Sequence, residues 1–432
     1  MSTFLQAIAT KAREQPKHRF GSLCNLLSEE YLEECWSGIR KDAAIGVDRI
    51  SAEEYERHLK ENIHDLVERL KRKQYRAHLV RRKYIPRWDG KQRPLGILVV
   101  EDKLVQLAVT RILEAIYGDD FLRCSYGYRP HVGAHDAVRD LTIKLQFGKY
   151  HYVVEADIRS FFDTIQPEWV VEMLRERIED GAFIRLIQKW LAVGVLDTDG
   201  QVLHPATGTP QGGIVSPMLA NIYLHYALDL WFQKVMKPQC QGEACLIRYA
   251  DDFVCAFEHR AEAERFYGML GERLAKFGLT LSEEKTRIID FGPSQTSSGK
   301  TSFDFLGFEF RWGRDHAGKP RVKRRTSRKK LKISRRVLTL WCRAKRVLPT
   351  GKMLRGLNAK LRGYYNYYGV IGNLPSLNEF FREAVRVFFK WLNRRSQRKS
   401  VTWAEFRLMY LPALERPRIV ERPRRQPTTV LA

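Results

Sequence analysis

The stretch "LIRYADDFVCAF" (246–257) constrains the fold most, because it sets two adjacent carboxylates, Asp251 and Asp252, inside an otherwise apolar run. Alternating β-branched and aromatic residues on both sides predict two strands joined by a tight turn. An exposed turn that tolerates Asp is the simplest explanation of such a pair. The apolar flanks argue instead for a half-buried hairpin with the carboxylates at its tip.

A second apolar run, "HYVVEADI" (151–158), predicts a strand that ends in a third carboxylate, Asp157. Helical periodicity surrounds these strands and also fills the chain before residue 75. The order strand, helix, strand-turn-strand, helix predicts an α+β fold with a split βαβ sheet. The expected helices cover 28–75 in part, 101–121, 168–181, 219–236 and 260–278, and the expected hairpins cover 79–98, 245–258 and 303–310.

In a split βαβ sheet the strand that ends in Asp157 can lie beside the hairpin that carries Asp251 and Asp252. Carboxylates gathered in this way repel one another unless a cation neutralises them. Hard divalent ions prefer oxygen ligands, so two Mg²⁺ ions, with Mn²⁺ as a substitute, are the expected cofactors. A pair of such ions suits phosphoryl transfer by in-line displacement.

Charge is distributed very unevenly along the chain. Residues 311–432 contain 33 Lys and Arg against 6 Asp and Glu, whereas residues 1–310 are close to neutral. A polyanion, nucleic acid before membrane, is therefore the expected partner of the last third. The alternative is a basic surface that is merely solvated.

Seven cysteines lie scattered, without the spacing of a zinc or redox motif. The sequence shows neither a signal peptide nor a long apolar run. These features predict a protein of the cytosol that does not bind membranes.

Several motifs then occur in the order of the reverse transcriptase motif blocks. They are "VEADIRSFFDTI", "GTPQGGIVSPMLANIYLH", "YADD", "GLTLSEEKTRII" and "FDFLGFEF". With "RPLGIL", "SYGYRP", "LRGYYNYYG" and "RRSQRKSVTW", the chain most resembles the group II intron-encoded reverse transcriptase/maturases of bacteria. The resemblance covers residues 20–415 and implies a right-hand polymerase with palm, fingers and α-helical thumb behind a helical N-terminal extension.

The resemblance implies that Asp157, Asp251 and Asp252 are the catalytic triad. Asp157 and Asp251 would be the main metal ligands, the backbone carbonyl of Ile158 a further one, and Asp252 would act partly through support of the others. Phe162 falls where similar enzymes keep an aromatic gate against the ribose 2′-hydroxyl. The alternative is that Phe162 is a core aromatic, because Phe161 is adjacent and the alignment to the motif could be shifted by one residue.

Further nucleotide contacts are implied by the same resemblance. Gln211 and Gly212 of "TPQGG" would meet the incoming nucleotide and the templating pair, and Tyr249 of "YADD" would pack on the primer terminus. Lys285 would protonate the departing pyrophosphate, with a solvated surface lysine as the alternative. Arg87, where similar enzymes often carry Lys, and Arg93 would grip the triphosphate across the hairpin turn.

The basic segment 323–348 is expected to form a helix with one packed face, carried by Leu331, Ile333, Val337, Leu340 and Trp341. The other face and the tyrosine-rich segment after it would bind nucleic acid, with a core role as the alternative for the tyrosines. The expected contacts are Arg324, Arg325, Lys329, Lys330, Arg335, Arg362, Tyr364 and Tyr365.

The domains expected from the resemblance are an N-terminal extension (1–78), fingers (79–150), palm (151–310, with part of the fingers around 170–206), thumb or maturase domain X (311–415) and a basic, poorly ordered tail (416–432). After His316 no histidine remains and Cys342 is the only cysteine, so no HNH endonuclease is expected. The expected partners are an RNA template, in particular group II intron RNA, a DNA primer or target, and dNTPs.

Two rival functions stay open at this level. One is a domesticated relative that serves phage defence, a CRISPR locus or DNA repair. The other is a maturase that only binds RNA. The sequence does not indicate an oligomeric state.

Overall fold

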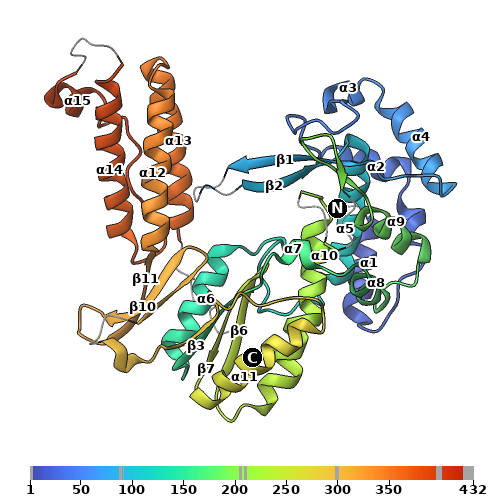
Figure 1. Cartoon of the computed structure of the whole chain (residues 1–432), viewed down its shortest axis with the longest axis horizontal. Helices are drawn as coiled ribbons and strands as arrows, with labels where there is room; N and C mark the ends of the chain where they lie inside the picture. The colour runs from blue at the N-terminus through green and yellow to red at the C-terminus, as the bar shows by residue number, and fades with distance from the viewer. Residues whose placement is uncertain are drawn as a thin grey trace, which may run out of the picture. The chain divides into compact units, whose positions relative to one another are not determined.

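A computed structural model describes residues 3–86, 90, 92–203, 207–208, 212–296, 301–395 and 401–421. The chain forms two compact units (Figure 1). Unit 1 comprises residues 1–133 and 152–288, and unit 2 comprises residues 134–151 and 289–432. The five expected domains divide the chain more finely than these two units and stay a prediction. The mixture of helices and strands agrees with the expected α+β class.

Unit 1 begins with short helices whose starts are visible in the sequence. The Ser28 and Ser51 hydroxyls accept hydrogen bonds from the Tyr31 and Glu54 amides, as expected of N-caps followed by Glu. These helices are α1 (Thr3–Glu14), η1 (Leu23–Leu26), α2 (Glu29–Trp36), α3 (Ala52–Glu56) and α4 (Leu59–Lys71).

The hairpin expected at 79–98 is confirmed. Strands β1 (Val80–Pro86) and β2 (Gln92–Ile97) pair antiparallel, and two short strands extend the sheet in the order β2-β1-β4-β5. The added strands are β4 (Val195–Leu196), which runs parallel to β1, and β5 (Val202–Leu203).

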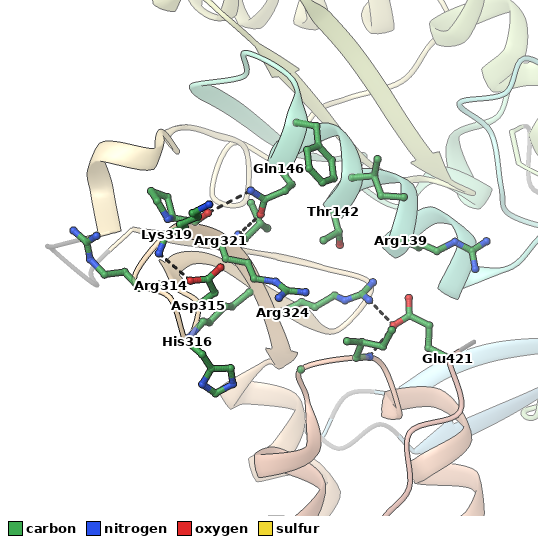
Figure 2. A pocket seen from close by; sticks show the side chains of 17 residues that line it. Arg139, Thr142, Gln146, Arg314, Asp315, His316, Lys319, Arg321, Arg324 and Glu421 are labelled. Atoms are coloured by element: carbon green, nitrogen blue, oxygen red, sulfur yellow. Dashed lines mark hydrogen bonds and ion pairs between the residues drawn. The ribbon is translucent and has the colours of Figure 1, made fainter. Parts of the chain in front are cut away.

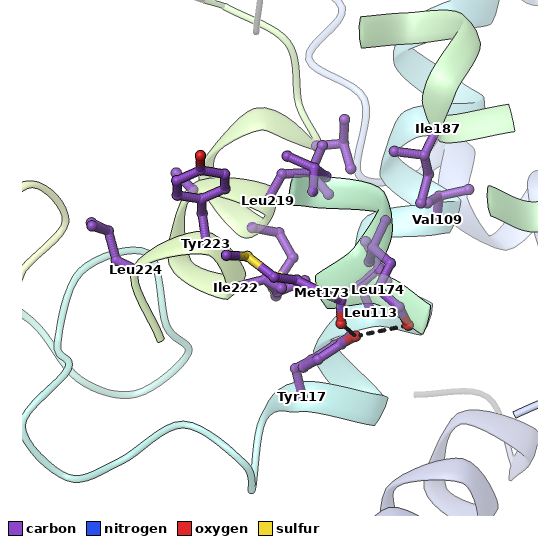
Figure 3. Close-up of a cluster of buried hydrophobic side chains, with 14 of the residues drawn as sticks. Val109, Leu113, Tyr117, Met173, Leu174, Ile187, Leu219, Ile222, Tyr223 and Leu224 are labelled. Atoms are coloured by element: carbon purple, nitrogen blue, oxygen red, sulfur yellow. Dashed lines mark hydrogen bonds between the residues drawn. The ribbon is translucent and has the colours of Figure 1, made fainter. Parts of the chain in front are cut away.

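The core of unit 1 is built largely by helices that bury apolar faces against one another. Figure 3 shows part of this core, where the Tyr117 hydroxyl also donates to the Met173 carbonyl at 3.2 Å. A buried tyrosine needs such a partner, because an unpaired hydroxyl in an apolar core is costly. The contributing helices are α5 (Val100–Tyr117), α7 (Phe161–Thr164), α8 (Pro167–Arg175), α9 (Gly181–Leu191) and α10 (Ser216–Leu224).

Two helix predictions need correction. The helix expected at 168–181 ends at Arg175, and Asp180 caps a separate helix, α9, by accepting from the Ala182 and Phe183 amides. The helix expected at 219–236 is α-helical only as far as Leu224. It continues as two π-helical turns, η2 (His225–Asp229) and η3 (Phe232–Met236), and ends in a 3₁₀ turn, η4 (Lys237–Gln239).

A second sheet carries the expected carboxylates. Its strand order is β6-β7-β3-β8, and α11 packs against β3 and β7. Gly278 follows α11 with φ +68°, a left-handed conformation that favours glycine at a helix end. The elements are β3 (Tyr152–Asp157), β6 (Ala244–Tyr249), β7 (Asp252–Phe257), α11 (Arg260–Ala275) and β8 (Arg287–Asp290).

Unit 2 combines a small sheet with long helices. Strand order is β11-β10-β9, and α12, α13 and α14 lie side by side beyond it (Figure 1). The elements are α6 (Ala134–Phe147), η5 (Pro293–Thr296), β9 (Ser302–Phe305), β10 (Phe308–Arg314), β11 (Pro320–Thr326), α12 (Arg328–Lys345), α13 (Thr350–Tyr368), α14 (Leu374–Leu392) and α15 (Trp403–Met409).

The prediction for 323–348 is wrong in two respects. The helix begins only at Arg328, because the residues before it form β11, and its buried side chains are Leu331, Leu338 and Cys342. Val337 and Leu340 are exposed rather than packed. The true apolar face is therefore narrower than the sequence suggested.

The first residues of the expected tail are anchored. The Val420 and Glu421 amides both donate to the Gly369 carbonyl, at 2.8 and 3.0 Å. A side chain at Gly369 would collide with the Arg418 carbonyl, so the close approach requires glycine. Of the helices in the described ranges, none has the length and apolarity that crossing a membrane requires.

Candidate active site

The sheet of unit 1 brings the three expected carboxylates to one place. Strands β3 and β7 pair antiparallel with Asp157 opposite Asp252. Strands β6 and β7 form the expected hairpin, and Asp251 lies at its tip after Ala250, whose φ is +56°. Asp157 and Asp252 are therefore neighbours across the sheet, and Asp251 directly precedes Asp252 at the hairpin tip.

A pocket of about 930 Å³ opens over this tip. Asp157 and Asp251 line it together with Arg93 from the β1–β2 hairpin, Phe162 and Lys285. A pocket of this size can hold a nucleotide. Several of the predicted nucleotide contacts thus face one space, although they come from separate parts of the sequence.

The carboxylates in this pocket influence one another. Burial raises the pKa of Asp251, and the charge of Asp157 raises it further, while Arg93 and Arg248 oppose the shift. Lys285 donates to the Asp157 carboxylate at 2.7 Å. The carbonyl of Asp157 accepts from the Ser282 amide at 2.8 Å, which holds the segment that carries Lys285 against the end of β3.

These residues fit a magnesium site that is completed by substrate. Across the described ranges, the side chains of His, Cys, Asp and Glu form no cluster of three or more that could hold a metal ion. Protein sites for Mg²⁺ commonly supply one or two carboxylates and leave the remaining positions to water and substrate phosphates. Asp157 and Asp251 supply two carboxylates in one pocket, and Lys285 is the cation that neutralises Asp157 here.

A buried network lies directly beneath the hairpin tip. Arg248, which is fully buried, donates to both carboxylate oxygens of Asp229 at 2.7 and 2.6 Å. It also donates to Asn221, to the Ser125 hydroxyl and to the Ala250 carbonyl at 3.0 Å. The carbonyl of the tip residue before Asp251 is thereby tied to the core.

Two glycines allow backbone segments to approach closely around the site. A Cβ at Gly127 would lie 2.3 Å from the Ala250 amide nitrogen, so the 124–127 segment needs glycine to fit against the tip. Gly212 has φ +118°, and a Cβ there would lie 2.2 Å from the Gly96 carbonyl oxygen. The close approach found at Gly212 is thus to strand β2.

Phe161 and Phe162 both line the pocket, but they differ in burial. Phe161 is 2% exposed and packs in the core, with its ring 6.4 Å from that of Tyr223. Phe162 is half-buried and lines the pocket. The gate role of Phe162 therefore stays a prediction. Tyr249 and Asp252 are also half-buried beside the tip, whereas Arg87 and Gln211 lie outside the described residues.

The chain was compared with known proteins. The family model for reverse transcriptase (RNA-dependent DNA polymerase) matches residues 85–310, just over half of the chain. This chain belongs to the reverse transcriptase family. The match includes the β6–β7 hairpin, strand β2 and the whole candidate site, and it confirms the resemblance that the motif order indicated.

Named relatives extend this reverse transcriptase assignment. Protein YkfC of Escherichia coli (strain K12) is 30% identical over 361 residues, which cover 74% of this chain and 91% of YkfC. Group II intron-encoded protein LtrA of Lactococcus lactis subsp. cremoris is 30% identical over 405 residues, covering 74% of this chain and 65% of LtrA. An uncharacterized 91 kDa protein in the cob intron of Schizosaccharomyces pombe is 40% identical over 163 residues, which are 38% of this chain and 20% of that protein.

Several nucleic-acid contacts expected in unit 2 are instead internal. Tyr365 is fully buried, and the Tyr364 ring stacks on Phe380 with centroids 3.8 Å apart. Both tyrosines therefore belong to the core of the reverse transcriptase, which was the alternative interpretation. Four arginines form ion pairs with carboxylates: Arg324 with Glu421, Arg325 with Glu309, Arg335 with Glu379 and Arg362 with Glu415. Lys329 and Lys330 are exposed.

Two features near the hairpin tip were not predicted from the sequence. They are the Arg248–Asp229 pair beneath the tip and the neighbouring Tyr128. Tyr128, whose φ is +55°, lies near the tip, and burial followed by the charge of Asp251 raises the pKa of its phenol. The buried pair had a visible signal. Arg248 and Asp229 are lone charges of opposite sign, each in an apolar segment, and such charges are buried only when paired.

Proposed function

We propose that this reverse transcriptase serves a group II intron, binds the intron RNA, aids its splicing and copies it into DNA. The observation that carries the proposal is the single pocket lined by Asp157, Asp251, Arg93 and Phe162. That set contains oxygen ligands for a metal, a cation for phosphates and an aromatic side chain for the sugar. Intron-related proteins among the relatives support the choice of RNA.

Asp157 and Asp251 would hold two Mg²⁺ ions, with the Ile158 carbonyl as a further ligand. When bound, such ions activate the primer 3′-hydroxyl and stabilise the charge that develops on the pyrophosphate. Asp252 stands opposite Asp157 in the sheet and would keep it oriented. Lys285 pairs with Asp157 here, and it would protonate the departing pyrophosphate.

The remaining contacts would select and position the nucleotide. Arg93 is exposed at the pocket and would grip the triphosphate bidentately. Phe162 would exclude a ribose 2′-hydroxyl by its bulk. In the corresponding right-hand architecture, the β1–β2 hairpin belongs to the fingers, the β6-β7-β3 sheet to the palm, and α12, α13 and α14 to the thumb.

The test of activity is primer extension on an RNA template with dNTPs and Mg²⁺. Wild type is expected to extend the primer, and Asp251→Asn to abolish extension without loss of folding. Asp290→Asn, at an exposed aspartate of β8, is the matched control and should extend normally. An inactive wild type, or an active Asp251→Asn variant, would contradict the proposed chemistry.

The assignment of Phe162 has its own test. Phe162→Ala is expected to raise the relative incorporation of ribonucleotides while dNTP use continues, because the bulk beside the sugar is removed. Single-nucleotide incorporation of dNTP against rNTP measures the ratio. An unchanged ratio would mean that Phe162 is only a packing residue.

The link to an intron is tested with RNA. Binding of a folded group II intron RNA taken from beside the coding frame should be tighter than binding of an unrelated structured RNA of equal length. The absence of such an RNA from that locus would contradict the intron assignment while leaving the polymerase assignment intact.

A further inference from the structure

Unit 2 contains a second pocket, of about 730 Å³, which shares no lining residue with the candidate active site. Helix α6 forms one wall and the β10–β11 hairpin forms the opposite wall (Figure 2). Ile371 and Gly372, between α13 and α14, and Glu421 also line the pocket. Nothing in the polymerase reaction described above uses these residues.

The two walls are joined by specific hydrogen bonds. The Gln146 side chain of α6 accepts from the Val322 amide at 2.8 Å and donates to the Pro320 carbonyl at 3.4 Å. At the end of the hairpin, the Asp315 carboxylate accepts from the Ala317 and Lys319 amides, both at 2.9 Å. The pocket is therefore built before any ligand binds.

The charge that faces this pocket is positive and largely uncompensated. Lys319, Arg321 and Lys323 are exposed, and their side chains have no hydrogen-bond or ion-pair partner in the part of the chain that the structure describes. The two carboxylates of the lining are already engaged. Asp315 holds the hairpin turn, and Glu421 accepts from Arg324 and from the Ile371 amide. An anionic ligand would thus meet free cations.

Exposed apolar side chains line the same pocket. Phe147, at the end of α6, is 82% exposed, and Ile143 and Ile371 are 45% and 42% exposed. A large aromatic side chain that remains in water is not explained by packing within the chain. Cations beside an exposed aromatic ring are the combination that binds an unpaired nucleotide, because the cations take the phosphate and the ring stacks on the base.

We propose that this pocket binds an unpaired nucleotide of a single strand, with its phosphate on Arg321 and Lys323 and its base on Phe147. A base-paired duplex would satisfy the cations but would not present a base face to the ring. The site goes beyond the polymerase function, since it would hold a strand segment that is not being copied. It does not require catalysis, so it can be tested even if the proposed reaction fails.

Fluorescence anisotropy with a labelled 12-nucleotide strand tests the site. The full chain is first saturated with unlabelled annealed primer–template, so that binding at the candidate active site does not contribute. Phe147→Ala should weaken binding about fivefold or more, with the same salt dependence, because stacking is lost and charge is kept. Arg321→Gln with Lys323→Gln should weaken binding and lower the slope of log K against log salt by about 1.4.

The control removes two cations elsewhere. Arg57→Gln with Lys60→Gln, at exposed residues of unit 1, should leave affinity and slope unchanged. Equal losses in this control, no loss in Phe147→Ala, or an equal loss for a fully paired hairpin would each overturn the proposal. A loss confined to RNA strands would support it with RNA as the ligand. Equal losses for RNA and DNA strands would support it for either nucleic acid.

Discussion

Two ion pairs in the active-site region of unit 1 differ sharply in burial. Arg248 and Asp229 are both 0% exposed and make two hydrogen bonds to each other. Lys285 and Asp157 are 65% and 37% exposed and make one, at 2.7 Å. Both pairs lie next to the candidate site, because the first ties down the hairpin tip and the second neutralises Asp157.

The difference indicates which pair is permanent. Removing one partner of a buried pair leaves an uncompensated charge in a dry core and costs about 3–5 kcal/mol. An exposed pair contributes about 0–1 kcal/mol, because water and salt replace the partner. Arg248 and Asp229 thus fix the hairpin tip, whereas the fold does not depend on the cation at Asp157, which under the proposed function would give way to a metal.

Loss of Arg248 should affect stability more than any other change considered below. Arg248→Met should lower the free energy of unfolding by about 3–5 kcal/mol, because Asp229 is left charged and buried. Primer extension should be lost with it. Chemical denaturation monitored by circular dichroism measures the first effect. An unfolding free energy within about 1 kcal/mol of wild type would contradict the permanence of this pair.

A double variant separates folding from positioning. Arg248→Met with Asp229→Leu removes both charges and should recover most of the lost stability, since apolar replacements of buried pairs are often neutral. Extension should stay impaired, because the Ala250 carbonyl no longer has the Arg248 donor. The half-saturating Mg²⁺ concentration of this variant should rise. Full recovery of extension would reduce the network to a purely structural role.

The comparison also shows how far the sequence could predict the site. Asp157 and Asp251 could be placed together because a split βαβ sheet sets the strand that ends in Asp157 beside the hairpin that carries Asp251. The Ser28 and Ser51 caps were predictable because capping is local. The lone opposite charges of Arg248 and Asp229 indicated a buried pair, but its geometry was not predictable, because Asp229 lies in a π-helical turn that changes which face of the helix it occupies.

In unit 2, the predictions from sequence were wrong for residues whose burial and partners depend on contacts distant along the chain. Val337 and Leu340 are apolar at helical spacing, yet they are exposed because the packed face of α12 follows Leu331 and Leu338 instead. Arg324 was predicted to contact nucleic acid on the basis of its charge alone. Its partner, Glu421, is 97 residues away along the chain, and no local sequence pattern predicts that pairing.

His225 is buried beside the Arg248–Asp229 pair, so the pH dependence of stability can test whether water reaches this region. Burial lowers the pKa of His225 from 6.5 to about 4, with the nearby charges of Asp229, Arg248, Lys234 and Arg129 as smaller influences. As pH falls, the unfolded chain takes up a proton first, so stability is present above pH 6.5 and is lost between 6.5 and 4. Between pH 6.5 and 4, the free energy of unfolding should fall by at most about 3 kcal/mol through this histidine.

His225→Leu is the comparison variant for this loss. Its unfolding free energy should fall less steeply than that of wild type between pH 6.5 and 4, while the carboxylates common to both proteins cancel in the difference. Denaturation curves at several pH values measure it. Parallel pH profiles for the two proteins would mean that water reaches His225, and the contrast in burial would be weaker than the structure indicates.

Removing Lys285 from the exposed pair should lower the rate of primer extension. Lys285→Gln should lower kcat about 10- to 100-fold with little change in the KM for dNTP, because a proton donor for the pyrophosphate is lost while nucleotide binding is kept. Single-turnover extension at saturating Mg²⁺ measures this step. An unchanged kcat, accompanied by a lower half-saturating Mg²⁺ concentration, would show that Lys285 acts only as the counter-ion of Asp157.

The exposed pair of Lys285 and Asp157 should contribute little to stability. A double-mutant cycle with Lys285→Gln and Asp157→Asn should give a coupling in the free energy of unfolding of about 0.2–1 kcal/mol. Because both side chains reach solvent, the coupling should shrink further in 1 M salt, where charges are screened within about 3 Å. A coupling of several kcal/mol that survives salt would make this pair as permanent as the buried one. Metal binding at Asp157 would then compete with the fold itself, and the division between a fixed tip and an exchangeable cation would fail.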